Sequence, residues 1–104
     1  MDRRPTQSYT ELRRYTEKWR WTDPRTGQRV TGYVHPQTAR DVERAPFYIK
    51  FLTKTGHVDE GVCVCLSVDT ARHQRKVQFT ASGEIRVVND ILVIDVDGTR
   101  FITH

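Results

Sequence analysis

The last sixty residues consist of short apolar runs separated by polar breaks, and this spacing limits the possible fold more than any other feature. Runs so short and so close together are typical of strands that pair as consecutive hairpins. We therefore expect a mainly β protein, a curved antiparallel sheet or small β-barrel of about six to eight strands. Small barrels of the SH3-like and OB kinds share this size and strand density, an analogy of architecture alone. The expected strands lie near residues 47–53, 61–67, 75–80, 84–88, 91–96 and 99–103.

Alternation along each run assigns one face of each strand to the core, because successive side chains of a strand point to opposite sides. Ile91 and Val93 fall on the face opposite to their neighbours, so that strand is apolar on both sides. A central strand covered by an N-terminal helix would explain this pattern. The expected core residues are Phe47, Ile49, Phe51, Val62, Val64, Leu66, Val77, Phe79, Ile85, Val87, Leu92, Ile94 and Val96.

The N-terminal part predicts a helix followed by a hairpin. Ser8 and Glu11 have the spacing of a capping box, which indicates a helix over residues 8–18. An apolar stripe follows at helical spacing, formed by Tyr9, Leu12, Tyr15 and Trp19. Residues 19–22 alternate like a strand, and turn residues at 23–27 lead to a return strand at 29–34. Residues 38–44 could form a second short helix, which Pro46 would end.

At 104 residues, the chain is expected to form a single domain over residues 8–104, preceded by a flexible segment at 1–7. No apolar run approaches the roughly 18–20 residues of a membrane span, and the charged N-terminus leads into no apolar signal segment. Cys63 and Cys65 lie on one face of a predicted strand, where a mutual disulfide would be strained. We therefore expect reduced thiols, a cytoplasmic location and no membrane partner.

The excess positive charge is confined to the first half of the chain. Residues 1–44 hold ten Lys and Arg against six Asp and Glu, whereas residues 45–104 hold seven of each. Aromatic residues are interleaved with these cations, and nucleic-acid binders use cations on phosphates and exposed rings on bases. The first hypothesis is therefore nucleic-acid contact through Arg13, Arg14, Lys18, Arg20, Arg25 and Arg29 on phosphates, with Trp21 as the stacking ring.

A structural interpretation competes with this hypothesis. The aromatic stripe also fits the buried side of an amphipathic helix, and Trp21 could pack against the sheet. No sequence signature of a known nucleic-acid-binding module is present. The alternative function is a protein-interaction or assembly domain that uses an exposed sheet edge, expected at the last strand, where two copies could form a homodimer.

Metal binding and catalysis have little support. Cys63 and Cys65 with His57 and His73 supply zinc-type ligands, but structural zinc sites rarely separate two cysteines by a single strand residue. Asp95, placed two residues before the turn residue Asp97, is expected to be a solvated strand position. The chain lacks a phosphate-binding glycine loop and the familiar hydrolase signatures. We expect a non-enzymatic binding module with no cofactor, no metal and no small-molecule substrate.

Overall fold

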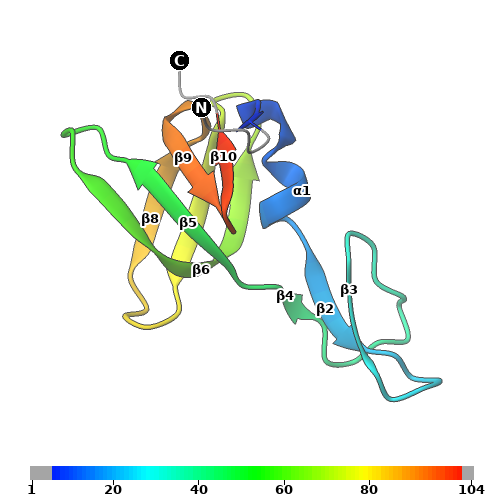
Figure 1. Ribbon diagram of the computed structural model, residues 1–104. Helices are drawn as coiled ribbons and strands as arrows, with labels where there is room; N and C mark the ends of the chain where they lie inside the picture. Colours follow the sequence, from blue (N-terminus) through cyan, green and yellow to red (C-terminus); the bar gives the residue numbers. More distant parts are fainter. Residues whose placement is uncertain (1–5, 102–104) are drawn as a thin grey trace.

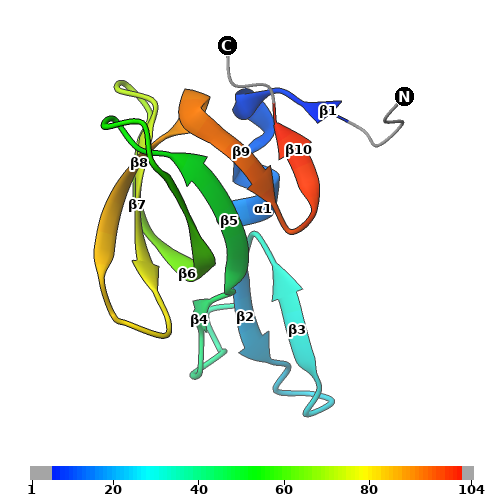
Figure 2. The same cartoon turned by 60° about the vertical axis from the view of Figure 1, so that its left-hand side comes forward.

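The computed structural model of the protein describes residues 6–101. It confirms a mainly β fold built on a strongly curved sheet, which Figures 1 and 2 show from two sides. The strand order is β1-β10-β9-β5-β6-β7-β8, and all neighbours are antiparallel except β1 and β10. The strands are β1 (Thr6–Gln7), β5 (Phe47–Leu52), β6 (Val58–Asp69), β7 (Gln74–Phe79), β8 (Ile85–Asn89), β9 (Val93–Val96) and β10 (Thr99–Phe101).

Pairing does not close this sheet into a barrel, because β8 has no second neighbour within the described part of the chain. The predicted last strand is not the sheet edge either, since β10 lies between β1 and β9. Part of the segment expected to be flexible, residues 6 and 7, therefore forms β1 at one edge. Residues 1–5, 102 and 103 of the predicted flexible segment and last strand lie outside the described residues.

A second, three-stranded sheet projects from the body in both views and is called the arm, residues 19–44 (Figures 1 and 2). Its order is β3-β2-β4, with β2 at Trp19–Thr22, β3 at Arg29–Gly32 and β4 at Glu43–Arg44. The predicted hairpin is confirmed, but the second helix is wrong, because β4 occupies its last residues and pairs with β2. The radius of gyration is 14.8 Å, compared with about 13 Å for a compact chain of this length.

The N-terminal helix is shorter than predicted and is divided into η1 (Tyr9–Glu11) and α1 (Arg13–Thr16). Ser8 accepts a hydrogen bond from the Thr10 N–H at 3.4 Å instead of completing the expected capping box. A single turn of helix is unstable alone, because nucleation fixes several residues for one hydrogen bond. Tertiary contacts must therefore hold α1 in place, beginning with Leu12, which is fully buried in the core.

The core confirms the inward faces of β5 and β7 but reverses the prediction for two other strands. Val62 and Leu66 of β6 and Ile85 and Val87 of β8 are exposed, and Val64, Leu92 and Ile94 are only half-buried. Fully buried residues at neighbouring positions take their place, namely Cys63, Cys65, Val88 and Val93.

Packing explains the reversal on β6. Cys63 is paired with Phe47 on one side and with Phe79 on the other, so a small side chain separates two phenyl groups. A Cβ atom at Gly61, which is on the same face, would lie 3.0 Å from the Phe79 ring. Small residues on this face of β6 therefore leave room for large side chains from both neighbouring strands, as dense packing requires.

One buried ion pair ties α1 to the sheet. The guanidinium group of Arg75 on β7 is 5 % exposed, and its Nε donates to the Asp90 carboxylate at 2.8 Å. A second nitrogen donates to the other oxygen of Asp90 at 3.3 Å. The remaining nitrogen donates to the Thr16 hydroxyl and to Glu17, 3.3 Å away, both from the end of α1. The carboxylate and its hydrogen bonds raise the pKa of Arg75 despite the opposing effect of burial.

Replacing Asp90 by asparagine should destabilise the fold strongly, because it leaves the buried guanidinium group with only the more distant and less buried carboxylate of Glu17. We expect the free energy of unfolding to fall by about 3 kcal/mol or more, measured by chemical denaturation at pH 7. The matched control is Glu11→Gln, which removes the partly exposed partner of Arg14 and should change stability by less than about 0.5 kcal/mol. Equal small effects from both variants would contradict a structural role for the buried pair.

Burial raises the pKa of the Cys63 thiol to about 12, with a smaller contribution from Cys65. The nucleophile in alkylation is the thiolate, so the folded protein should react very slowly with iodoacetamide at pH 8. Peptide mass spectrometry after labelling in the presence and absence of denaturant measures this difference. Similar labelling rates in the two states would show that Cys63 is accessible in the native protein.

Candidate nucleic-acid interface

The arm has one charged face and one aromatic face, as the pairing of its strands dictates. Arg20 on β2 is opposite Thr31 on β3 and Glu43 on β4, and Thr22 is opposite Arg29. Because paired residues point to the same side of a sheet, these five side chains share one face. The alternate positions of β2 and β3 carry the two tryptophans and their neighbours on the other face.

A network of hydrogen-bonded charges crosses the three strands of the charged face. Glu43 accepts from Arg20 at 2.6 Å and from Arg29 at 2.8 Å. Asp41 accepts from a second nitrogen of Arg29 at 2.6 Å, from the Thr22 hydroxyl at 2.6 Å and from the Thr22 N–H at 2.9 Å. The bonds from Thr22 are the main reason that the pKa of Asp41 is lowered, and the charge of Arg29 adds to them. Two guanidinium groups are thus neutralised by two carboxylates.

The aromatic face buries the ring that was expected to stack on bases. Trp21 is only 7 % exposed, and its ring crosses Gly32, where a Cβ atom would lie 3.2 Å away. Trp19 is covered by the guanidinium group of Arg44, 3.8 Å from the ring centre, and meets His35 edge-on at 5.5 Å. In this conformation the Trp21 ring is not available to a base, because the arm uses both indoles for its own packing.

Two hydrogen bonds join the arm to the end of α1, and a third closes the base of the arm. The Tyr33 hydroxyl donates to the carbonyl of Arg14 at 2.5 Å. Arg44, which lies over Trp19, also donates to the carbonyl of Glu17 at 3.2 Å. The Ala45 N–H donates to the carbonyl of Lys18 at 2.9 Å, where the chain returns from the arm to the body. These bonds join the arm to the body through backbone groups, which limits how far it can swing.

The predicted contact residues do not form one cluster. Arg13 and Arg14 lie exposed on α1, and Arg14 has Glu11 as a partner at 3.3 Å. Lys18 lines a cleft of about 260 Å³ between arm and body, together with Arg20, which belongs to the charge network described above.

Arg25 and Arg40 are the cations of the arm that face solvent most freely. Arg25 lies in the turn between β2 and β3, the far end of the hairpin, and Arg40 lies in the loop before β4. Among residues 6–101, neither side chain has an acidic partner. Arg40 was not a predicted contact residue, and the only signal for it was its place among the cations of the first half.

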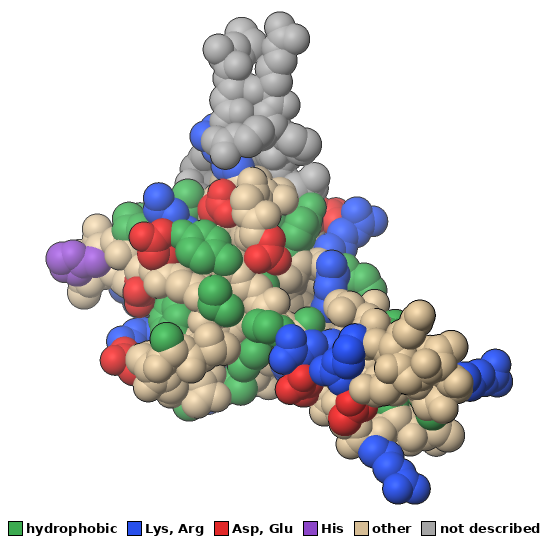
Figure 3. Space-filling model, turned by 60° about the horizontal axis from the view of Figure 1, so that its bottom comes forward, with side chains coloured by type: hydrophobic (Ala, Val, Ile, Leu, Met, Phe, Trp, Pro, Cys, Tyr) green, Lys and Arg blue, Asp and Glu red, His purple; other side chains and the backbone are tan. Residues whose placement is uncertain are grey.

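Figure 3 views the molecule from below and shows where charge gathers on this side. Lys and Arg side chains cluster at the junction of arm and body, next to acidic groups, and further cations stand at the outer end of the arm. On the body, acidic, basic and hydrophobic side chains are mixed. The cations are therefore most prominent on and beside the arm.

The described residues contain no group of three or more His, Cys, Asp or Glu side chains arranged to hold a metal ion. The same part of the chain has no helix that is long and apolar enough to cross a membrane. Comparison with protein-family models, curated proteins and solved structures finds no match. The functional argument therefore depends on the geometry of the chain itself.

Acrylamide quenching should confirm that the Trp21 indole is shielded. In a Trp19→Phe variant, Trp21 is the remaining indole, and its 7 % exposure should give a quenching constant well below that of free N-acetyltryptophanamide. The same protein in denaturant provides the exposed reference. A native quenching constant close to that reference would mean that the arm does not pack its aromatic face as described.

Proposed function

We propose that the protein is a non-enzymatic binding module whose arm contacts the phosphate backbone of nucleic acid. The observation that carries the proposal is the position of three cations that have no carboxylate partner among the described residues: Arg25 at the tip, Arg40 in the adjoining loop and Lys18 at the base. Arg44 also lacks a carboxylate partner, but it is held over Trp19 and by the carbonyl of Glu17. Residues 18–44 hold six Lys and Arg against three Asp and Glu, an excess of 6 − 3 = 3 positive charges. Cations that are already held by other groups gain less from a phosphate, so Arg25, Arg40 and Lys18 should dominate binding.

The shape of the arm supports a duplex as the target. A two-stranded β-ribbon fits the major groove, which is about 12 Å wide, and several DNA-binding proteins insert strands in this way. The hairpin of β2 and β3 projects from the body as such a ribbon (Figure 1). Single-strand binding would need exposed rings for base stacking, whereas Trp21 is buried and Trp19 is covered by Arg44.

The charge network has a supporting role in this proposal. Arg20 and Arg29 are matched in number by Asp41 and Glu43, so together these four groups add no net charge. Their bonds connect β2, β3 and the segment before β4, which makes the ribbon stiffer. Phosphate contacts carry little sequence information, so we expect similar affinity for duplexes of different sequence.

Removing the two exposed arginines should weaken binding in a salt-dependent way. If Arg25 and Arg40 each neutralise one phosphate, the slope of log affinity against log salt should fall by about 1.8 in the Arg25→Gln, Arg40→Gln double variant. Fluorescence anisotropy with a labelled 20-base-pair duplex, titrated at several salt concentrations, measures this slope.

The matched control is a Lys54→Gln, Lys76→Gln double variant, which removes the same charge from exposed positions on the body. Its slope should equal that of the unaltered protein. Equal losses in the two double variants would indicate unspecific attraction to net charge. No binding at about 50 mM salt, or an affinity that does not change with salt concentration, would exclude the proposed phosphate contacts.

A further inference from the structure

The unpaired edge of β8 borders a seam in the body, on the side away from the arm (Figure 1). The opposite wall of the seam is the hairpin formed by β5 and β6. The guanidinium group of Arg86 crosses it, with Nε 3.7 Å from the carboxylate of Asp59 on β6. No backbone pairing between described residues closes the sheet at this point.

The backbone of β8 offers hydrogen-bonding groups to the seam. The backbone carbonyl of Glu84 accepts from the N–H of Phe79 at 2.9 Å, and the backbone N–H of Asp90 donates to the carbonyl of His73 at 2.8 Å. The even-numbered residues of β8 therefore bond to β7. Antiparallel pairing alternates, so the N–H and C=O groups of residues 85, 87 and 89 point to the open side, where the Ile85 carbonyl already accepts from the guanidinium group of Arg86 at 3.1 Å. A strand laid along this edge would find an alternating series of donors and acceptors.

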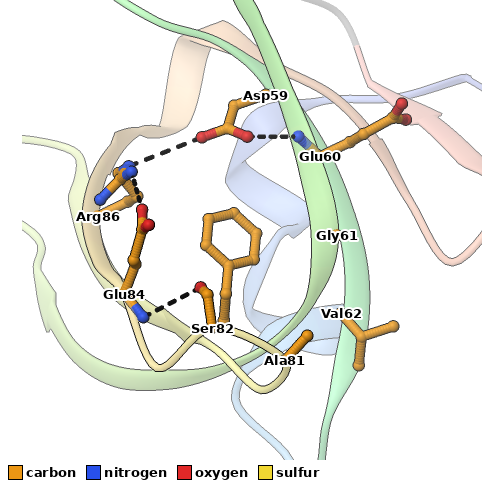
Figure 4. Close-up of a pocket in the computed structure, with 9 residues that line it drawn as sticks. Asp59, Glu60, Gly61, Val62, Ala81, Ser82, Glu84 and Arg86 are labelled. Carbon is orange, nitrogen blue, oxygen red and sulfur yellow. Dashed lines mark hydrogen bonds and ion pairs between the residues drawn. The ribbon is translucent and has the colours of Figure 1, made fainter.

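A cavity of about 220 Å³ lies at the first end of the seam, with Phe79 among its lining residues. Figure 4 shows Asp59 and Glu84 converging on Arg86, whereas the side chain of Glu60 points away. Two carboxylates thus face one guanidinium group, which leaves an excess of one negative charge. A Lys or Arg side chain fits this cavity, with its stem on the phenyl ring and its charged end at the carboxylates.

A second cavity, of about 270 Å³, lies further along the same edge and also includes Arg86 in its lining. Its apolar walls come from Phe51 and Leu52 on one side and from Val87 and Leu92 on the other. This composition suits an aliphatic side chain, because burial against these groups removes apolar surface from water. The two cavities are neighbours along one strand edge and differ in chemistry.

We infer that the seam binds an extended peptide of another protein, which pairs with β8 and places a basic side chain in the first cavity and an aliphatic side chain in the second. Side chains on one side of a strand recur every second residue, so the two anchors are separated by two or four positions. Nucleic acid does not suit this site, because the carboxylates of Asp59 and Glu84 repel phosphate.

A second copy of the chain also fits poorly at this edge. A two-fold axis centred on Arg86 would place two guanidinium groups opposite each other. Axes centred on Val87 or Val88 would bring Asp90 into the pairing, where the chain has left β8 and the carboxylate is buried against Arg75. A two-fold axis centred on a residue before Arg86 would require the turn before β8 to pair with the second copy. There the N–H of Gly83 donates to Phe79, and its carbonyl accepts from the Gln78 side chain. The register with two Arg86 side chains opposed and the hydrogen-bonded turn thus disfavour a second copy, and the excess negative charge of the first cavity favours a partner with a basic side chain.

Selection from a displayed library of random ten-residue peptides against the immobilised full chain tests the inference. We expect enriched peptides to lack internal proline and to carry Lys or Arg two or four residues from Val, Ile or Leu. Synthetic versions of the enriched peptides are then titrated against the protein and its variants by fluorescence anisotropy.

Two variants test the charge and the edge separately. Glu84→Lys should lower the affinity for the basic peptides by about tenfold or more, because it replaces an attractive charge by a repulsive one. Its matched control is Glu11→Lys, at a partly exposed position on η1, which should leave affinity unchanged. Val87→Pro removes an N–H that points to the open side, so the β7 pairing survives while peptide binding is lost. Thermal unfolding checks that each variant folds.

The inference is supported if the enriched peptides carry the basic and aliphatic residues and bind the Glu84→Lys protein more weakly, but the Glu11→Lys protein as well as the unaltered one. This holds even if Val87→Pro fails to fold. Enrichment without such a motif, or equal affinity for all folded variants, would overturn it. A dimer in light scattering that Val87→Pro converts to a monomer would also overturn it, because a second copy would then occupy the edge.

Discussion

The buried guanidinium group of Arg75 joins three parts of the chain that are distant in sequence. It comes from β7 and binds the carboxylate of Asp90 in the short 3-10 helix η2 (Asp90–Leu92), and it reaches Thr16 and Glu17 at the end of α1. Burying such a charge is unfavourable unless charge and hydrogen bonds compensate it, and here both are present. Among the described residues no buried side-chain nitrogen or oxygen lacks a partner. A helix of one turn is stable on this sheet because Thr16 and Glu17 at its end accept hydrogen bonds from the buried guanidinium group of Arg75.

The position of the arm follows from the same contacts. Glu17, which meets Arg75 through its side chain, accepts from Arg44 through its carbonyl. Arg44 covers Trp19 at the start of β2, so a continuous series of contacts leads from the buried ion pair to the arm. The Tyr33 hydroxyl adds a hydrogen bond to the carbonyl of Arg14, within α1. The proposed nucleic-acid interface and the proposed peptide seam thus lie on different sides of one body, and α1 connects the arm to it.

The sequence predicted the class of fold and most strand positions, because short β-branched runs are a local property. The sequence-based prediction was wrong where either set of alternate residues along a strand could have faced the core. On β6, the pattern of larger aliphatic residues pointed to Val62 and Leu66, whereas the smaller Cys63 and Cys65 fit between neighbouring phenyl groups. That choice depends on β5 and β7, which a pattern within one strand cannot show. The bend in the long strand β6 accompanies a register shift near Ser67, which also has no local signal.

The candidate site was predictable only in part. Charge counting located the cations in the first half of the chain, but it could not show that Arg20 and Arg29 are neutralised by Asp41 and Glu43. It also could not show that Trp21 is buried on Gly32, since that contact joins two strands. The seam beside β8 had no sequence signal, because its walls come from separate hairpins that meet only in the folded chain.

Amide hydrogen exchange at Thr16 tests the central claim most directly. The Thr16 N–H donates to the carbonyl of Leu12 at 3.0 Å within a one-turn helix that would exchange freely without tertiary support. The account predicts protection of this amide close to that of the central β6 amides, such as Cys63. Exchange of Thr16 as fast as an exposed loop, while β6 stays protected, would show that the buried ion pair does not hold α1 on the sheet.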